Sequence, residues 1–396
     1  MKKLLVITLC VVMVMSLAAC GGGEAEQGVT DDSIKIGSVG VTSGPLAFIG
    51  SPYYEGMTAY LNTINEQGGV NGREIELIVE DDEFDPALAI DGVNSLIEDE
   101  GVFAIVGQLG TPGVLATADI VEEHGIPSVY FGSGAVELTT LGENFFPVQP
   151  NYVYEGKLKA KYAIEEFDAE RIGVIYSNDD VGLEGIQGIE EGLAEMGKED
   201  ALVADVSFAP GETDLTAQVQ QLRDSDPDVI IVYTLAAGAT PALRQINDFQ
   251  MVDIPIITSY SNADASFIAA VEPTTIQDII DDIYVMGWLD VDEEGLDPLA
   301  TAMSEYYPES MINAYTMAGW VAGEVFVAGL EEAGDDLTWE GYIEAMENIH
   351  FTEGMAPEVS YSGGVRQGVT HMSLSNIVQD EDGNWIFQQY TDFNEF

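Results

Sequence analysis

The residues with the clearest binding chemistry lie in a glycine-rich turn, "GQLGTPG", at positions 107–113. Ile105 and Val106 end an apolar run that predicts a buried strand, and Val114 begins an apolar repeat at helical spacing. The first N–H groups of a helix have no partner within the helix, and they carry a partial positive charge. We therefore expect the turn to bind a carboxylate or a similar acceptor group, with Thr111 as the main contact. The alternative is that Thr111 only caps the helix, which contributes about 1 kcal/mol.

Strands and helices alternate along the chain, and they determine where this turn lies. A first round has predicted strands at 34–41, 74–82, 102–107 and 126–132, separated by helices at 53–69, 86–101 and 111–125. A second round, from residue 152 to 260, repeats the alternation. This order predicts the α/β class, with two similar lobes that each contain a doubly wound parallel sheet. Late helices at 313–334 and near 338–348, and strands around 368–379 and 385–390, follow both lobes.

The turns that follow the strands are the expected binding segments. Open parallel sheets bind ligands beyond the carboxyl ends of their strands, and a crevice between two lobes is the default site. Three such turns belong to each lobe: 42–52, 107–113 and 132–139, then 178–185, 235–241 and 259–266.

The first twenty residues are typical of an export signal. Two lysines precede an apolar run at 4–15, which is shorter than the roughly 20 residues of a membrane-spanning helix. The stretch "LAAC", which ends at Cys20, resembles a bacterial lipobox, in which the cysteine becomes the lipid-modified first residue. We predict a signal peptide at 1–19 and a flexible tether at 20–33, with a plain signal peptide and a chance cysteine as the alternative. Since Cys10 is the only other cysteine, no disulfide is expected.

The chain is strongly acidic throughout. It has 70 Asp and Glu against 12 Lys and Arg, and its formal net charge is −58. Such a surface repels nucleic acid and anionic lipid head groups, so neither is an expected partner. Because molar salt shortens the Debye length to about 3 Å, we hypothesise a halophilic protein in a saline medium, and the sequence leaves open whether alkaline pH contributes to the acidity. An unusually acidic mesophilic protein is the alternative.

Several segments resemble the periplasmic solute-binding proteins for leucine, isoleucine and valine. The similarity is carried by "IKIGSVGVTSGPLAFIG", "EGMTAYLNTINEQGGVNGREIELIVEDDEFDP", "ELT", "YVYEGKLKAKYAI" and "IGVIYSNDDVG", and it extends over about residues 34–390. The resemblance implies a type I clamshell with three crossovers, placed near 150, 284 and 355. One lobe would then comprise 34–150 and about 285–354, and the other 151–284 and about 355–396. The lobes would close on a small ligand and dock on an ABC transporter permease, with the protein a monomer held to the membrane by its lipid anchor alone.

The resemblance also assigns roles in the turns. It gives the hydroxyl and N–H of Thr111 to the ligand carboxylate and the carbonyl of Gly132 to a ligand ammonium. The family has a second hydroxyl where this chain has Gly134, and Ser133 is the neighbouring hydroxyl that could compensate. A glycine turn without ligand contact is the alternative.

Tyr260 is the main departure from the family pattern. Branched-chain binders carry at this strand end a glutamate that pairs with the ligand ammonium, and a buried ammonium without a counter-charge costs several kcal/mol. Either the ligand has no α-ammonium, or another acid such as Asp180 or Asp264 serves. Both acids are otherwise expected to be solvated turn residues.

The remaining candidate binding residues lie in the same turns or beside them. They are Phe48, Ile49, Gln108, Gly110, Tyr152, Val181, Leu235, Ala236 and Trp288, with hinge and core packing as the alternative role. Aromatic members would suit an aromatic or aliphatic acid.

Sequence motifs for catalysis and for metal or cofactor binding are not found. The chain has three histidines far apart, and it contains no H-E-x-x-H, G-x-S-x-G, P-loop or calcium-loop pattern. We therefore expect no enzyme, no cofactor and no metal. The expected function is the capture of a branched-chain or other hydrophobic amino acid, or a related acid or amide, for an ABC importer. A ligand-sensing receptor subunit with the same clamshell is the alternative.

Overall fold

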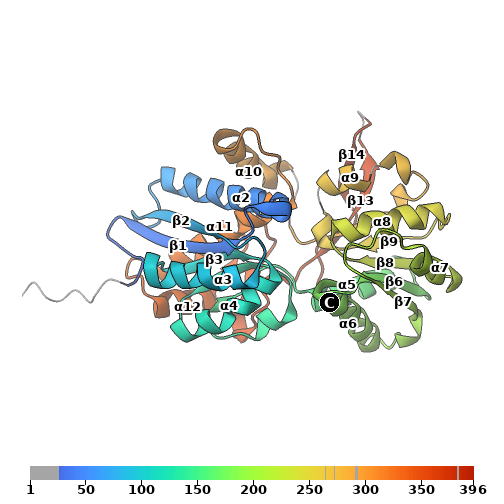
Figure 1. The fold of residues 1–396 in the computed structure, drawn as a ribbon, viewed down its shortest axis with the longest axis horizontal. Coiled ribbons are helices and arrows are strands. Elements are labelled where there is room, and N and C mark those ends of the chain that lie inside the picture. Colours follow the sequence, from blue (N-terminus) through green and yellow to red (C-terminus); the bar gives the residue numbers. More distant parts are fainter. Residues whose placement is uncertain (1–25, 264, 272, 290–292, 381–382) are drawn as a thin grey trace, which may run out of the picture.

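The computed structural model describes residues 26–263, 265–271, 273–289, 293–380 and 383–396. The predicted signal peptide, Cys20 and Asp264 lie outside the described residues. Figure 1 shows two α/β lobes side by side, each with a sheet covered by helices. The prediction of two lobes with parallel sheets is confirmed.

The first lobe contains a five-stranded parallel sheet in the order β2-β1-β3-β4-β5. Its strands are β1 Ser33–Gly40, β2 Glu74–Asp81, β3 Ala104–Leu109, β4 Ser128–Gly132 and β5 Phe145–Phe146. Helices from two distant parts of the chain cover it (Figure 1): α2 Ala47–Glu66, α3 Pro86–Asn94, α4 Thr111–His124, and then α10 Glu293–Tyr306, α11 Ala314–Ala333 and α12 Trp339–Asn348. A small antiparallel pair, β11 His350–Phe351 and β12 Val359–Ser360, follows.

The second lobe contains a seven-stranded sheet in the order β14-β13-β10-β9-β8-β6-β7. Its strands are β6 Ile172–Ser177, β7 Leu202–Phe208, β8 Val229–Tyr233, β9 Ile256–Thr258, β10 Ile283–Gly287, β13 Ser373–Gln379 and β14 Trp385–Gln389. The last two are antiparallel to their neighbours, while β6 to β10 are parallel. The helices are α5 Tyr152–Glu165, α6 Asp180–Glu195, α7 Thr216–Asp224, α8 Ala236–Asp248 and α9 Ala265–Val271.

Three passages of the chain join the two sheets. The first follows β5, the second follows β10 through Trp288 and Leu289, and the third precedes β13. The first and third lie against each other, since Val369 N donates to Val148 O at 2.8 Å.

We propose that the third passage lies later in the chain than residue 355, where the resemblance placed it. Arg366 still belongs to the first lobe's contacts, because its guanidinium donates to Glu143 O at 2.9 Å and to Glu347 Oε1 at 2.7 Å. We propose lobe boundaries at these three passages.

Candidate functional site

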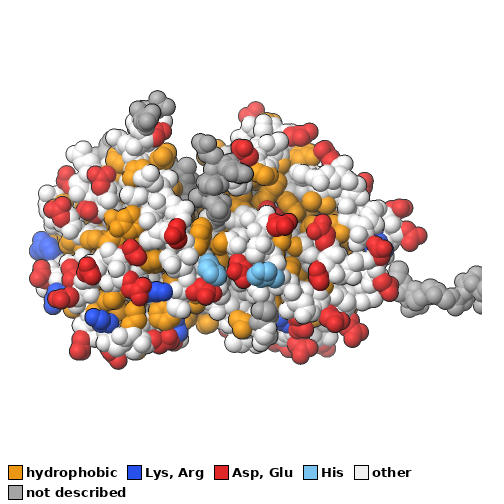
Figure 2. Space-filling view, turned by 180° about the vertical axis from the view of Figure 1, so that it is seen from behind, with side chains coloured by type: hydrophobic (Ala, Val, Ile, Leu, Met, Phe, Trp, Pro, Cys, Tyr) orange, Lys and Arg blue, Asp and Glu red, His pale blue; other side chains and the backbone are white. Residues whose placement is uncertain are grey.

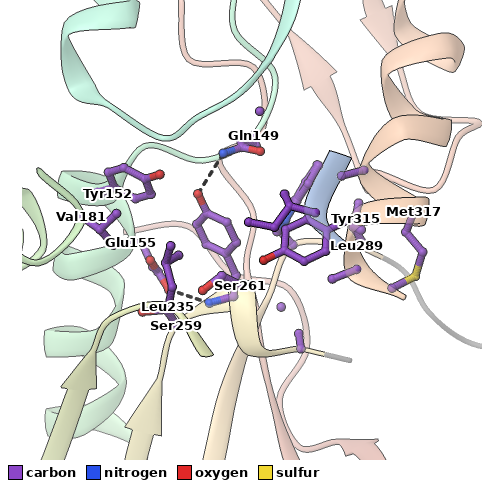
Figure 3. Close-up of a pocket in the computed structure, with 18 of the residues that line it drawn as sticks. Gln149, Tyr152, Glu155, Val181, Leu235, Ser259, Ser261, Leu289, Tyr315 and Met317 are labelled. Carbon is purple, nitrogen blue, oxygen red and sulfur yellow. Dashed lines mark hydrogen bonds between the residues drawn. The ribbon is translucent and has the colours of Figure 1, made fainter. Parts of the chain in front are cut away.

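A cavity of about 490 Å³ lies between the two lobes. Ten of the residues predicted from the sequence line it: Ile49, Gly110, Thr111, Gly132, Tyr152, Asp180, Val181, Leu235, Tyr260 and Trp288. Figure 3 shows Tyr152, Val181 and Leu235 on one side of this space and Tyr315 and Met317 on the other. The turns after the strands thus meet at one site, as parallel sheets require.

Five predicted residues do not line the cavity. Phe48 is 62% exposed on the surface, and Gln108 is buried, with its Nε2 donating to Thr117 Oγ1 at 2.9 Å. Ser133 and Gly134 lie behind the lining residues, and Ala236 begins helix α8 beside the lining residue Leu235. For Gln108, the strand register turns the side chain toward helix α4 instead of the cleft.

Helix α4 points its first turn at the cavity. Gly110 is the residue before the helix, with a φ of 106° that favours glycine, and its N–H donates to Gly132 O at 3.2 Å. Gly110 therefore occupies the N-cap position of α4. Thr111 is the first residue of the helix and not its cap. The hydroxyls of Thr111 and Ser133 lie 2.6 Å apart. Because Pro112 has no N–H, the N–H and hydroxyl of Thr111 are the donors that this turn offers to the lining.

Tyr152 closes the space beside Gly134. A Cβ atom on Gly134 would lie 2.6 Å from Tyr152 Cε1 and 2.7 Å from the Tyr260 hydroxyl oxygen. Burial raises the pKa of Tyr152, and contacts with the Gly134 backbone and the Thr111 hydroxyl oppose that rise. The Tyr152 phenol therefore lies next to the Thr111 hydroxyl, and a side chain at position 134 would collide with its ring.

Tyr260 is held by a residue that the sequence did not point to. Gln149, on the first passage between the lobes, donates through Nε2 to the Tyr260 hydroxyl at 3.1 Å (Figure 3), and its Oε1 accepts from the Tyr130 hydroxyl at 3.1 Å. The Tyr260 hydroxyl in turn donates to Pro150 O at 3.3 Å. Burial raises the pKa of Tyr260 well above its ordinary value, so this phenol stays neutral. The amide thus connects a tyrosine of each lobe.

A fully buried ion pair forms the floor of the cavity on the second lobe. Glu155, which lines the cavity, and Lys159 lie on α5 with Oε1 and Nζ 3.2 Å apart, and both are 0% exposed. Glu155 Oε1 also accepts from Tyr260 N at 2.9 Å, and Oε2 accepts from the Tyr233 hydroxyl at 2.6 Å. Burial lowers the pKa of Lys159 to about 8, with Glu155 opposing the decrease. Lys159 Nζ donates to Ser259 Oγ at 2.8 Å, so the pair fixes the turn that carries Tyr260.

The other cavity carboxylates lie toward the rim. Asp179 caps α6, since its Oδ1 accepts from Gly182 N at 3.1 Å and from Ser177 Oγ at 2.7 Å. Asp180 is exposed to solvent. Neither carboxylate is buried beside Thr111.

The remaining walls are largely apolar and aromatic. Trp288 lies between Tyr130 and Tyr260, with a ring-centroid distance of 6.4 Å to each. Lining residues without a local sequence signal are Tyr53, Phe84, Gln149, Glu155, Leu289, Tyr315 and Met317. Within the described part of the chain, no group of three or more His, Cys, Asp or Glu side chains is arranged to hold a metal ion. The chemistry available is reversible binding of a small molecule with one acceptor end and an apolar body.

Comparison with known proteins gives a consistent picture. The family model described as "Periplasmic binding protein" matches residues 33–383. A leucine-specific-binding protein of Salmonella typhimurium is 28% identical over 205 residues, which are 52% of this chain and 55% of that protein. The chain thus spans little more than half the length of the curated relatives that it matches first.

Solved structures share the fold over nearly the whole chain. An ABC transporter substrate-binding protein from Sphaerobacter thermophilus has a TM-score of 0.80 at 23% identity, covering 92% of this chain and 99% of that one. A solute-binding protein of an ABC transporter from R. palustris, in complex with 4-hydroxybenzoate, has a TM-score of 0.77 at 18% identity, with 92% and 98% covered. Together with the family match, the two lobes and the cavity between them identify this chain as a member of the periplasmic binding protein family.

Proposed function

We propose that the protein captures a small carboxylate-bearing solute outside the cytoplasmic membrane and delivers it to an ABC importer. The observation that carries the proposal is the cavity between the lobes, with the Thr111 turn at one end and aromatic and aliphatic walls around it. A helix N-terminus suits an anion, and the walls suit an apolar body.

Capture would proceed by closure of the two lobes. The first lobe would bind the carboxylate through Thr111, and the second lobe would then close with Val181, Leu235 and Tyr260 over the ligand body. The hydrogen bond between Val369 and Val148 joins two of the three passages into one bending region. A ligand shifts such an equilibrium only by its differential affinity for the closed form.

Attachment to the membrane would depend on Cys20 alone. Among the described residues, no helix is both long and apolar enough to cross a membrane. We propose that a lipid on Cys20 holds a monomer beside its permease, with the segment between Cys20 and Gln27 as the tether. The predicted tether extended to residue 33, but Gln27 is already bonded to the first lobe, since its Nε2 donates to Ile97 O at 3.2 Å and to Val102 O at 3.1 Å.

The test is a binding screen at high salt. Branched-chain amino acids, their keto acids, aromatic acids and short amides are added to the purified protein, and melting temperature and calorimetric affinity are measured. Thr111→Val should weaken the best ligand by about 10- to 100-fold, because a hydrogen bond to a charged group is lost. The control is Thr140→Val, an exposed threonine whose hydroxyl donates to Glu137 O at 2.8 Å. If Thr111→Val binds as tightly as the native protein, the carboxylate site is not at this turn.

A further inference from the structure

Among the described residues that line the cavity, no unpaired carboxylate is buried at the Thr111 end. Glu155 is the buried carboxylate among the lining residues, and Lys159 neutralises it at 3.2 Å. Its two oxygens also accept from Tyr260 N and the Tyr233 hydroxyl. Asp82 is buried near the first turn of α4, with Oδ2 3.1 Å from where a Cβ on Gly113 would lie, but it is not a lining residue.

Four neutral acceptors around the Thr111 turn each already accept one hydrogen bond. Gly132 O accepts from Gly110 N at 3.2 Å, and Gly134 O accepts from Tyr152 N at 2.7 Å. Gln149 Oε1 accepts from Tyr130, and the Tyr260 hydroxyl accepts from Gln149. These oxygens can accept a further hydrogen bond, but none of them carries the negative charge that would compensate a buried ammonium.

Two tyrosines fill the space beside the turn. The rings of Tyr152 and Tyr260 are stacked, with centroids 6.5 Å apart and planes 16° apart, and each side chain is 8% exposed. Both lie against Gly134, where a Cβ would already be too close to either residue. A substituent next to a carboxylate at Thr111 would meet these rings.

We infer that the ligand is a monocarboxylic acid with an apolar aliphatic or aromatic body and no α-ammonium group, an inference that rests on the proposed function. Among the described residues, an α-ammonium beside Thr111 would be buried without an unpaired carboxylate as its counter-charge, which is strongly unfavourable. The apolar body would lie against Trp288, Leu289 and Met317, which line the same cavity.

Pairs of probes that differ only in the α-ammonium test this inference. They are 4-methylpentanoate with L-leucine and 3-phenylpropanoate with L-phenylalanine, titrated calorimetrically into the purified protein in molar NaCl. We expect the better-fitting acid to bind roughly 100-fold more tightly than its amino acid, since an unpaired buried charge is avoided. Equal or tighter binding of the amino acid in that pair would overturn the inference and leave the proposed function intact. If no acid, amino acid or amide binds, the proposed function itself fails.

A variant pair adds a second readout. Tyr260→Glu introduces a carboxylate beside the turn and should reduce the preference for the acid at least about 10-fold, because an ammonium then has a partner. Tyr260→Phe removes only the hydroxyl and should keep the preference. Circular dichroism and melting curves establish that both variants fold, and the native protein's preference is a test that does not depend on them. An unchanged preference in a folded Tyr260→Glu protein would contradict the assignment of this position.

Discussion

Glu324 lies inside the first lobe on helix α11, 8% exposed. Its Oε1 accepts from Trp320 Nε1 at 2.7 Å and its Oε2 from Met355 N at 2.9 Å. Burial nevertheless dominates and raises the pKa of this carboxyl to about 7, with the two hydrogen bonds opposing the rise. The side chain thus ties α11 to the segment before β12, and its protonation changes near neutral pH.

The raised pKa makes the stability of the protein depend on pH. Between the ordinary glutamate pKa and about 7, the folded protein keeps the proton and the unfolded chain loses it. The stabilisation from Glu324 is therefore complete below the ordinary pKa and is lost as the pH rises through about 7, by about 3 kcal/mol in total. We expect the free energy of unfolding of Glu324→Gln, taken relative to that of the native protein, to increase from pH 5 to pH 8. Denaturant titration at both pH values measures this difference. Glu331→Gln, an exposed change on the same helix, should show no such gain. A pH-independent difference for Glu324→Gln would contradict the assignment.

The Glu155–Lys159 pair shows why some site residues escape prediction. A glutamate four residues before a lysine on a helix is typical of an exposed pair. The structure buries both, because α5 is covered by α6 and by the turn that contains Ser259. Gln149 and Tyr315 likewise reach the cavity from segments with no local binding signal. Thr111 and Gly132 were predictable, since strand-to-helix turns of a parallel sheet meet at one edge.

Elements were predictable where their hydrophobic period is regular. The strands and helices of the first round and the long helix α11 lie close to their predicted ranges. Helix α2 begins at Ala47, earlier than the predicted residue 53, and contains Pro52 in its interior, where a proline removes one helical N–H donor. Strand β10 was not predicted, because a strand of five residues shows too little alternation to be recognised. Helix α10 was not predicted either. Strands β13 and β14 of the second sheet were expected as strands. Their antiparallel pairing was not, because it depends on where the third passage returns the chain to this sheet.

Each lobe contains one pair of helices whose backbones touch through glycines. Between α5 and α6, a Cβ on Gly188 would lie 2.0 Å from Val153 O. Between α2 and α11, a Cβ on Gly319 would lie 1.8 Å from Tyr53 O. Because α5 carries Tyr152 and Glu155, and α2 carries Tyr53, these close contacts also position the lining of the cavity.

Replacing one of these glycines tests the importance of close packing. Gly188→Ala gains about 1 kcal/mol of helix propensity but forces α5 and α6 apart, since the clash is with backbone. We expect a net loss of about 2 kcal/mol in the free energy of unfolding, measured in denaturant. Glu190→Ala, on the exposed face of the same helix, should change stability by less than about 0.5 kcal/mol. A Gly188→Ala protein more stable than the native one would show that propensity outweighs the contact.

Acidic side chains are spread over the whole visible surface, and basic ones are few (Figure 2). With 70 acidic and 12 basic residues, the chain has too few basic side chains to pair with most of its carboxylates. The partly buried Lys157 contacts two acids, Glu191 at 3.1 Å and Glu195 at 2.8 Å. Such self-repulsion acts on the compact state at low ionic strength and opposes folding.

Salt should therefore stabilise the protein. The Debye length falls from about 10 Å at 0.1 M to about 3 Å at 1 M, so repulsion between surface carboxylates is largely screened in molar NaCl. An increase of only about 2 kcal/mol in the free energy of unfolding would raise the melting temperature by roughly 4–8 °C for lobes of this size. Calorimetric melting from low to molar NaCl measures the rise, and sucrose at matched osmolarity separates screening from solvent exclusion, because sucrose stabilises without screening charge. A melting temperature that stays constant or falls with NaCl, or that rises equally in sucrose, would contradict the hypothesis that the acidic surface is adapted to a saline medium.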